Sequence, residues 1–281
     1  MKTFKPRTPG QRGRTQIAYG EILTVQKPLK SLTSGRKRGV GRNNQGRITM
    51  RHKGAGAKRR DRHVDFLMAK HGVPGIIKTV EYDPNRSAFI GLIAYKDGDR
   101  RYMVLPQGVT AGAEIMVAEN APIKPGNRLP LKQIPIGTFI YNIELKPMGG
   151  AKMVRSAGSF AEVIAQDNGY THVKMPSSEI RKVPQTSWAS VGAVSNDEHH
   201  LVNLGKAGRS RHLGRRPKVR GSAMNPVDHP HGGGEGRQGR GLRRAKTMWG
   251  KPSGKGQKTR TPKKYSNYLI VTRRKVGKKR G

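Results

Sequence analysis

The sequence predicts an all-β fold in which two small barrels are flanked by long, irregular, basic extensions. The middle of the chain has short apolar segments with the two-residue period of strands, separated by turn residues. The two ends instead contain most of the charge and the glycine. No segment shows the apolar period of a helix longer than about three turns.

The charge is divided unevenly along the 281 residues. The net charge is +40, of which residues 1–60 contribute +16, residues 61–200 only +2 and residues 201–281 +22. A protein this basic repels itself unless a polyanion neutralises it, and nucleic acid gains affinity from counterion release at each phosphate. We therefore predict a basic glycine-rich extension at 1–60, barrels at 61–125 and 126–200, and a second basic glycine-rich extension at 201–281. Each extension is expected to become ordered on its partner.

Composition also excludes several classes of site and protein. There is no cysteine, so disulfides and thiolate metal sites are absent. No apolar run reaches the roughly 18 residues of a membrane-spanning helix, and the first ten residues lack the apolar core of a signal peptide. We expect a cytoplasmic protein with no membrane partner and no cofactor.

The N-terminal extension begins with a mixed segment and then becomes strongly basic. Residues 21–25 are apolar enough to form one strand or an anchored loop, whereas residues 35–60 alternate cations with glycine. The Asn43-Asn44 pair lies between Arg42 and Arg47. Asn can contact phosphate, 2′-OH or base edges, and Arg binds phosphate through its planar guanidinium, so this pattern favours binding over a solvated disordered extension.

Five strands are predicted for the first barrel. They are residues 64–68, 76–82, 88–95, 101–105 and 114–117. Pro84 and the Asp97-Gly98 pair mark tight turns between them. Five short strands with hairpin turns suit a small Greek-key barrel, an OB-fold.

A proline-rich segment, residues 121–135, marks the boundary to the second barrel. Its predicted strands are residues 138–145, 161–165, 170–175, 179–183 and 189–194, which have the size and spacing of an SH3-like barrel. Aromatic residues make up only 5% of the chain, so both cores are expected to be aliphatic. The barrels together have a net charge of only +2, which predicts one basic face rather than a uniformly basic surface.

The C-terminal extension contains the most distinctive segment of the chain, residues 220–236 (RGSAMNPVDHPHGGGEG), which we name the histidine loop. It has neither a helical nor a strand period. Its prolines favour extended conformations in the residues before them, and its three consecutive glycines permit positive φ and close approach to another surface. The pattern predicts an irregular loop shaped to fit a partner. One further strand is predicted at residues 268–271.

Asp228, His229 and His231 permit two other interpretations. A carboxylate that orients an imidazole suits general-base catalysis, but no nucleophile is marked. Three nitrogen and oxygen ligands suit zinc, but the surrounding +22 charge repels a cation. Hydrogen bonds to phosphate, ribose or the backbone of the loop explain the same residues, so we predict neither catalysis nor a metal site.

Basic doublets and triplets recur through both extensions, with glycine between them and few aromatic residues. Such runs are often only solvated surface, but here they suit a chain that threads between RNA helices while Arg bridges phosphates. The scarcity of aromatics argues against a single-strand binder that stacks bases. Trp249 either stacks on a base or packs within the protein. A nonspecific DNA-compacting protein fits the charge, but not the two barrels or the histidine loop.

Several motifs resemble the L2 family of large-subunit ribosomal proteins, of the bacterial or organellar type. They are GRNNQGRIT (41–49), IPIGT (134–138), NIEL (142–145), RSAG (155–158), LGKAGR (204–209) and, most specifically, MNPVDHPHGGGEG (224–236). The resemblance extends in order over nearly the whole chain. Departures from the family pattern occur at Ala55, Ala57, Asp61, Trp188 and His212.

This resemblance implies an OB-fold barrel followed by an SH3-like barrel, bound to 23S-type rRNA of the large subunit. It implies a non-enzymatic structural constituent that supports the peptidyl-transferase region, tRNA binding and association of the two subunits. The implied partners are large-subunit rRNA, other large-subunit proteins, the small subunit at the interface and, indirectly, tRNA. The implied location is the cytoplasmic ribosome or, alternatively, a mitochondrial or plastid ribosome.

Cationic, amide, imidazole and carboxylate side chains at these motifs and on the barrels are predicted to bind rRNA. The predicted residues are Arg42, Asn43, Asn44, Arg47, Arg51, His52, Lys58, Arg59, Arg60, Arg86, Arg155, Lys174, Arg209, Arg211, Arg215, Arg216, Arg220, Asn225, Asp228, His229, His231, Arg237, Arg243, Arg244 and Lys258.

Overall fold

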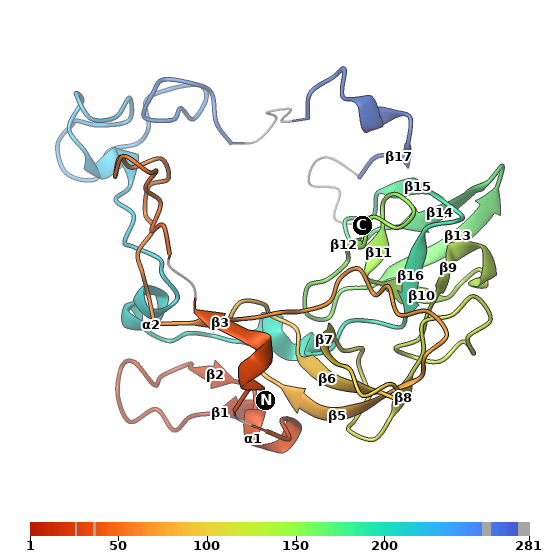
Figure 1. Cartoon of the computed structure of the whole chain (residues 1–281). Coiled ribbons are helices and arrows are strands. Elements are labelled where there is room, and N and C mark those ends of the chain that lie inside the picture. Colours follow the sequence, from red (N-terminus) through yellow and green to blue (C-terminus); the bar gives the residue numbers. More distant parts are fainter. Residues whose placement is uncertain (26, 36–37, 255–259, 275–281) are drawn as a thin grey trace. The chain divides into compact units, whose positions relative to one another are not determined.

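A computed structural model describes residues 1–25, 27–35, 38–254 and 260–274 and confirms the all-β fold (Figure 1). The described residues form two compact units. Unit 1 comprises the described residues of Met1–Lys37, Lys58–Ala207 and Tyr268–Gly281, and unit 2 those of Arg38–Ala57 and Gly208–Asn267. Parts of both basic extensions therefore fold together, in unit 2.

A four-stranded antiparallel sheet in unit 1 corresponds to the first predicted barrel, with the order β7-β6-β5-β8. Its strands are β5 (Gly75–Glu81), β6 (Ile90–Tyr95), β7 (Arg100–Val104) and β8 (Glu114–Ile115). β6 and β7 form a hairpin in which Gly98 has a φ of 86°, as the Asp-Gly pair predicts. Ile77, Phe89 and Ile93 are buried in the core beside this sheet.

The strand predicted at residues 64–68 is wrong. The carboxylate of Asp65 accepts the amide N–H of Met68 at 2.8 Å, and Met68 has a φ of 51°, so the chain turns here. Val64 forms an isolated bridge with Tyr102. The Met68 side chain is nevertheless buried in the core, which explains the apolar pattern.

A seven-stranded sheet corresponds to the second predicted barrel, with the order β17-β15-β14-β13-β10-β16-β9. Its strands are β9 (Arg128–Pro130), β10 (Phe139–Tyr141), β13 (Ala161–Asp167), β14 (Tyr170–Lys174), β15 (Ile180–Pro184), β16 (Trp188–Val191) and β17 (Ile270–Thr272). The core is aliphatic and includes Leu131, Ile140 and Val163. β17 comes from the C-terminal extension and pairs with β15 at the edge of this sheet (Figure 1).

Two predictions in this region need correction. Residues 138–145 are not one strand, because Asn142 has a φ of 49° and bends the chain. β11 (Ile143–Glu144) follows this bend and pairs with β12 (Ala151–Met153) in a separate two-stranded sheet. The proline-rich boundary also contains a strand, β9, which the prolines concealed because they usually interrupt or end strands.

Short elements complete the structure. In unit 1 they are β1 (Lys2–Thr3), β2 (Thr15–Gln16), α1 (Tyr19–Ile22), η1 (Lys30–Leu32), β3 (Thr33–Gly35), β4 (Arg60–Arg62), η2 (Leu131–Gln133) and η3 (Asp197–Leu201). In unit 2 they are α2 (Ala207–His212), except for its first residue, η4 (Gly221–Ala223) and η5 (Tyr265–Asn267). Residues 21–25 are not a strand: residues 21–22 end α1, and residues 23–25 form an anchored loop, in which the amide of Thr24 donates to the Val80 carbonyl at 3.1 Å. Within the described parts of the chain, no helix is long and apolar enough to span a membrane.

A buried ion pair lies within the second barrel. The guanidinium of Arg128 donates to a carboxylate oxygen of Glu144 at 2.9 Å and to the Asn142 carbonyl at 2.7 Å. Both charged side chains are almost completely buried. Burial lowers the pKa of Arg128, and the neighbouring Glu144 carboxylate opposes this shift. Arg128 is therefore a structural cation that is inaccessible to a polyanion.

Candidate nucleic-acid interface

Unit 2 forms where the two extensions run antiparallel to each other. Backbone contacts join residues 52–57 of the first extension to residues 212–216 of the second. They are Gly54 N to Gly214 O (2.9 Å), Ala57 N to His212 O (2.8 Å), Arg216 N to His52 O (3.1 Å) and the Lys53–Arg215 bridge. We name this arrangement the arm crossing.

The two segments of the arm crossing approach each other so closely at two glycines that neither position has room for a side chain. Gly56 has a φ of 65°, and a Cβ atom there would lie 2.5 Å from the His212 carbonyl oxygen. Gly214 has a φ of 86°, and its Cβ would lie 2.9 Å from the Gly54 carbonyl oxygen. Only glycine satisfies both requirements at these positions. Ala55 and Ala57, which depart from the family pattern, are exposed and leave the crossing intact.

Five cations from both extensions line one hollow of unit 2, with a volume of about 490 Å³. They are Arg42, Arg51, Lys53, Arg211 and Arg216. No described Asp or Glu lines this cationic hollow, and the sequence segments of unit 2 contain only two carboxylates, Asp228 and Glu235, against 22 Lys and Arg. Cations gathered in this way repel one another until an anion binds between them. The cationic hollow is therefore the best candidate phosphate site among the described residues.

The two predicted asparagines have different surroundings. The Asn43 side-chain oxygen accepts the amide N–H groups of Gln45 (3.0 Å) and Arg47 (2.9 Å), so it shapes the loop. Asn44 and the Arg47 side chain are exposed on that loop. Asn43 thus orders the loop on which Asn44 and Arg47 are exposed, a role that the sequence pattern did not distinguish from direct binding.

The histidine loop is ordered by its own imidazoles. His229 Nδ1 accepts the amide N–H of His231 at 3.0 Å, and His231 Nε2 accepts the amide N–H of Lys246 at 3.0 Å. The two ring centroids are 4.7 Å apart. Gly221 lies against the His229 ring, and a Cβ there would lie 2.5 Å from the ring. Both imidazoles therefore act as neutral hydrogen-bond acceptors within the loop.

The electrostatics of the loop agree with this role. Desolvation, and then the positive surroundings that include His229 and Lys246, lower the pKa of His231 and so favour its neutral form. The Asp228 side chain is exposed. Among the described residues, no group of three His, Asp or Glu side chains has the arrangement of a metal site. The geometry supports the hydrogen-bonding interpretation of the two histidines.

Three predicted barrel residues already have partners within unit 1. The contacts are Arg86 with Asp83 (2.5 Å), Arg155 over the Phe66 ring (4.5 Å) and Lys174 with Glu162 (3.3 Å). Asp83 is completely buried and holds Arg86 in place. The Lys174 pair is exposed and therefore weak, so Lys174 can exchange this carboxylate for a phosphate at little cost.

The structure thus divides the predicted binding residues into two groups. Those in unit 2 are Arg42, Asn43, Asn44, Arg47, Arg51, His52, Arg209, Arg211, Arg215, Arg216, Arg220, Asn225, Asp228, His229, His231, Arg237, Arg243 and Arg244. Those in unit 1 are Lys58, Arg59, Arg60, Arg86, Arg155 and Lys174, and Lys258 lies outside the described residues. Lys53 of the cationic hollow was missed, although it lies in the same basic run as Arg51 and His52.

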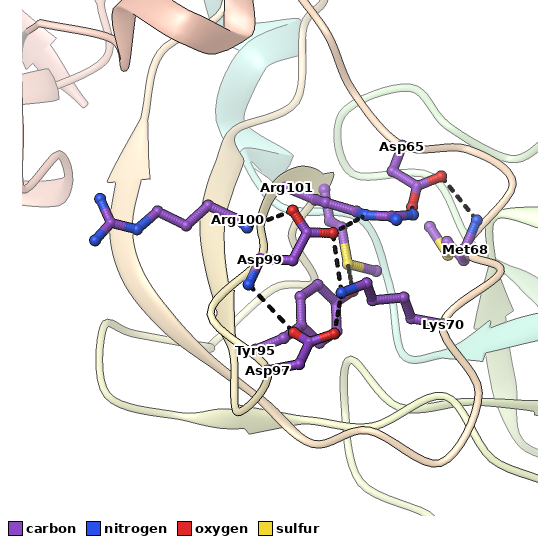
Figure 2. Close-up of polar contacts among 9 residues, drawn as sticks. Asp65, Met68, Lys70, Tyr95, Asp97, Asp99, Arg100 and Arg101 are labelled. Carbon is purple, nitrogen blue, oxygen red and sulfur yellow. Dashed lines mark hydrogen bonds and ion pairs between the residues drawn. The ribbon is translucent and has the colours of Figure 1, made fainter.

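The acidic residues around the β6–β7 hairpin are neutralised within unit 1 (Figure 2). Lys70 pairs with Asp97 and, at 2.9 Å, with Asp99. Arg101 pairs with Asp65 at 2.8 Å and with Asp99 at 2.9 Å. Hydrogen bonds from Lys70 and then from Arg101 lower the pKa of Asp99 to about 2. Lys70 and Arg101 are therefore held in a structural network.

A cleft of unit 1 has the opposite character to the cationic hollow. Its volume is about 580 Å³, and no described Lys or Arg lines it. Glu21, Asp197 and Glu198 line it together with apolar side chains such as Phe89 and Leu105. Phosphates are repelled from such a cleft, so any RNA contact of unit 1 is expected on other parts of its surface.

Comparison with known proteins identifies relatives of the whole chain. Residues 29–117 match the family model described as "Ribosomal Proteins L2, RNA binding N-terminal domain", and residues 124–250 match "Ribosomal Proteins L2, C-terminal domain". The chain is 51% identical, over 279 residues, to the large ribosomal subunit protein uL2 of Dinoroseobacter shibae, and the alignment covers 99% of each protein. The two family matches meet between β8 and β9, where the sheets of unit 1 also change.

Proposed function

The chain belongs to the L2 family of ribosomal proteins, and on this basis we propose that it is a non-enzymatic structural constituent of the large ribosomal subunit that binds 23S-type rRNA. The cationic hollow is the observation that best supports this function. It gathers five cations from two distant segments and has no described carboxylate to neutralise them. Phosphates of folded RNA supply the missing negative charge, and the counterions they release favour binding.

The arm crossing sets the geometry of this binding. Its backbone hydrogen bonds fix the distance between the cations of residues 42–53 and those of residues 211–216. Arg binds phosphate through two parallel hydrogen bonds, so each side chain also fixes the direction of its phosphate. RNA strands that bind the two segments are thereby held at a set spacing. Holding RNA strands in this way is the function expected of a structural component.

The histidine loop is the part of the chain that we assign to the peptidyl-transferase region. Its internal hydrogen bonds hold a compact turn, on which Asn225 and Asp228 are exposed and Val227 is 90% exposed. We assign to this turn the support of the peptidyl-transferase region and, indirectly, of tRNA binding. We also assign to the chain contacts with other large-subunit proteins, and contacts with the small subunit when the two subunits associate.

The relative from Dinoroseobacter shibae favours a cytoplasmic, bacterial-type ribosome as the location. The comparisons give no support to the mitochondrial or plastid alternative.

Competition between RNA and DNA tests the proposed function. We expect the full chain to prefer a 23S-type rRNA transcript over random duplex DNA by roughly 10³-fold or more at the same salt concentration, the ratio typical of specific over nonspecific binding. Equal affinity for the two would instead support nonspecific compaction of nucleic acid. Activity of the RNA-free protein that His229→Ala abolishes would support an enzyme and contradict the proposal.

A further inference from the structure

We propose that unit 2 also binds one unstacked nucleobase, in a second hollow beside the indole of Trp249. This inference rests on the proposed rRNA binding and adds to it a site for a base. The sequence left two roles open for Trp249, and its side chain is 72% exposed, which rules out packing in a core.

The base hollow, as we name it, has a volume of about 540 Å³ and is formed by three segments far apart in the sequence. Its lining residues are Ile48, Thr49, Met50, Arg51, His52, Val219, Gly221, Met224, His229, Met248 and Trp249. No described carboxylate lines it. Apolar and aromatic side chains with a few polar groups are the usual lining of a site for a planar organic ligand.

Two apolar side chains of this hollow are largely exposed to solvent. Ile48 and Val219 are each 63% exposed, although unit 2 is otherwise rich in Lys, Arg and Gly. An occupant with a flat apolar face would cover them and stack on the indole of Trp249. The face of a nucleobase has these properties, and base–aromatic stacking tolerates any base.

The base hollow adjoins the cationic hollow. Both are lined by Ile48, Met50, Arg51 and His52, so these residues form a shared wall. A single nucleotide can therefore place its phosphate among the cations on one side and its base against Trp249 on the other. Bulged and loop nucleotides of folded RNA present bases in this unstacked form. The adjacent cations favour a nucleotide over an apolar protein segment.

His229 gives the base hollow a polar side chain. Its Nδ1 already accepts the amide N–H of His231, so the proton of the neutral ring is on Nε2. His229 and Arg51 both line the hollow and both have N–H donors, and the Arg51 guanidinium contacts the sulfur of Met248, another lining residue. They suit a base edge that presents hydrogen-bond acceptors.

Tryptophan fluorescence and rRNA affinity test the base site together. The chain has only two tryptophans, so Trp188→Phe leaves Trp249 as the single reporter in the full chain. We expect a 23S-type rRNA transcript to quench its emission. Trp249→Ala should weaken rRNA binding by roughly 5- to 150-fold, the loss expected for one stacked base, and Trp249→Phe should restore most of it. The salt dependence should not change, because no charge is removed.

Tyr265→Ala provides a matched control, because Tyr265 is also in unit 2, is 79% exposed and does not line the hollow. This variant should bind rRNA like the unmodified chain. If Trp249→Ala also binds normally, the base site is wrong while the rRNA function stands. Quenching that appears only after large-subunit proteins are added would overturn the base site in favour of a protein segment. If the unmodified chain does not bind the transcript, the proposed function itself fails.

Discussion

At the residue scale, Gly56 determines whether the two extensions can approach each other. An L-residue in the left-handed region costs about 1–2 kcal/mol. At Gly56 the Cβ would in addition lie 2.5 Å from the His212 carbonyl oxygen, in backbone that cannot move without breaking the arm crossing. We expect Gly56→Ala to separate residues 52–57 from residues 212–216, to increase cleavage of unit 2 in limited proteolysis and to weaken rRNA binding.

Gly241→Ala is the matched control for this prediction. Gly241 has a φ of 63°, close to that of Gly56, but no atom lies within 4 Å of its Cβ position. Gly241→Ala therefore has the conformational cost of a positive φ without a steric collision at Cβ. Equal effects of the two substitutions would show that close approach at the arm crossing is unimportant.

His231 gives the histidine loop a pH dependence of defined sign. Its folded pKa is lowered, so folding favours the neutral ring, which accepts the amide of Lys246. The stabilisation is complete above the ordinary histidine pKa of about 6.5 and is lost as the pH falls through the lowered value. We expect the hydrogen-exchange protection factor of the Lys246 amide to decrease on acidification.

The variant His231→Ala lacks the acceptor, so its Lys246 amide should show low protection at every pH. Protection factors corrected for the intrinsic pH dependence of exchange are the quantity to compare. A Lys246 amide that becomes better protected in acid would contradict the assigned hydrogen bond.

At the scale of elements, the buried pair Arg128–Glu144 links β9 to β11 within unit 1. Removal of one partner leaves a buried charge without compensation. We expect Glu144→Gln to lower the free energy of unfolding by about 3–5 kcal/mol in urea denaturation. Glu162→Gln, which removes the carboxylate of the exposed pair with Lys174, should cost only about 0–1 kcal/mol. Similar losses in both variants would contradict the structural role of the buried pair.

The elements that the sequence predicted correctly are the strands with a clear two-residue period and a marked turn. β6 and β7 are examples, because the Asp97-Gly98 turn fixes the hairpin between them. The failures at residues 64–68 and 138–145 have one cause. Met68 and Asn142 have positive φ, which interrupts a strand and which no apolar period reveals. The pairs β1–β2 and β3–β4 are too short to have a period.

The candidate site was predictable residue by residue but not as a site. The basic glycine-rich pattern identified Arg42, Arg51, Arg211 and Arg216 separately. It did not show that their segments meet, because the arm crossing is made by backbone hydrogen bonds and has no apolar pattern. The arm crossing requires glycine at positions 56 and 214, but glycine is too frequent in both extensions for the sequence to single these two out.

At the scale of the whole molecule, the charged side chains of the two units differ in their partners. In unit 1 many acids and cations pair with each other, as around Asp99 (Figure 2). In unit 2 almost no carboxylates are available for the cations. Affinity for rRNA should therefore depend on which cations are removed and not only on how many.

The salt dependence of rRNA binding tests this claim most directly. The triple variant Arg42→Gln, Lys53→Gln and Arg211→Gln removes three cations of the cationic hollow. We predict that its slope of log affinity against log salt decreases in magnitude by about 3, roughly one for each lost phosphate contact. The triple variant Lys96→Gln, Lys124→Gln and Lys132→Gln removes the same charge from exposed positions of unit 1 and should leave the slope nearly unchanged. Equal decreases in the two variants would show that total charge, and not the hollow where the extensions meet, binds the RNA.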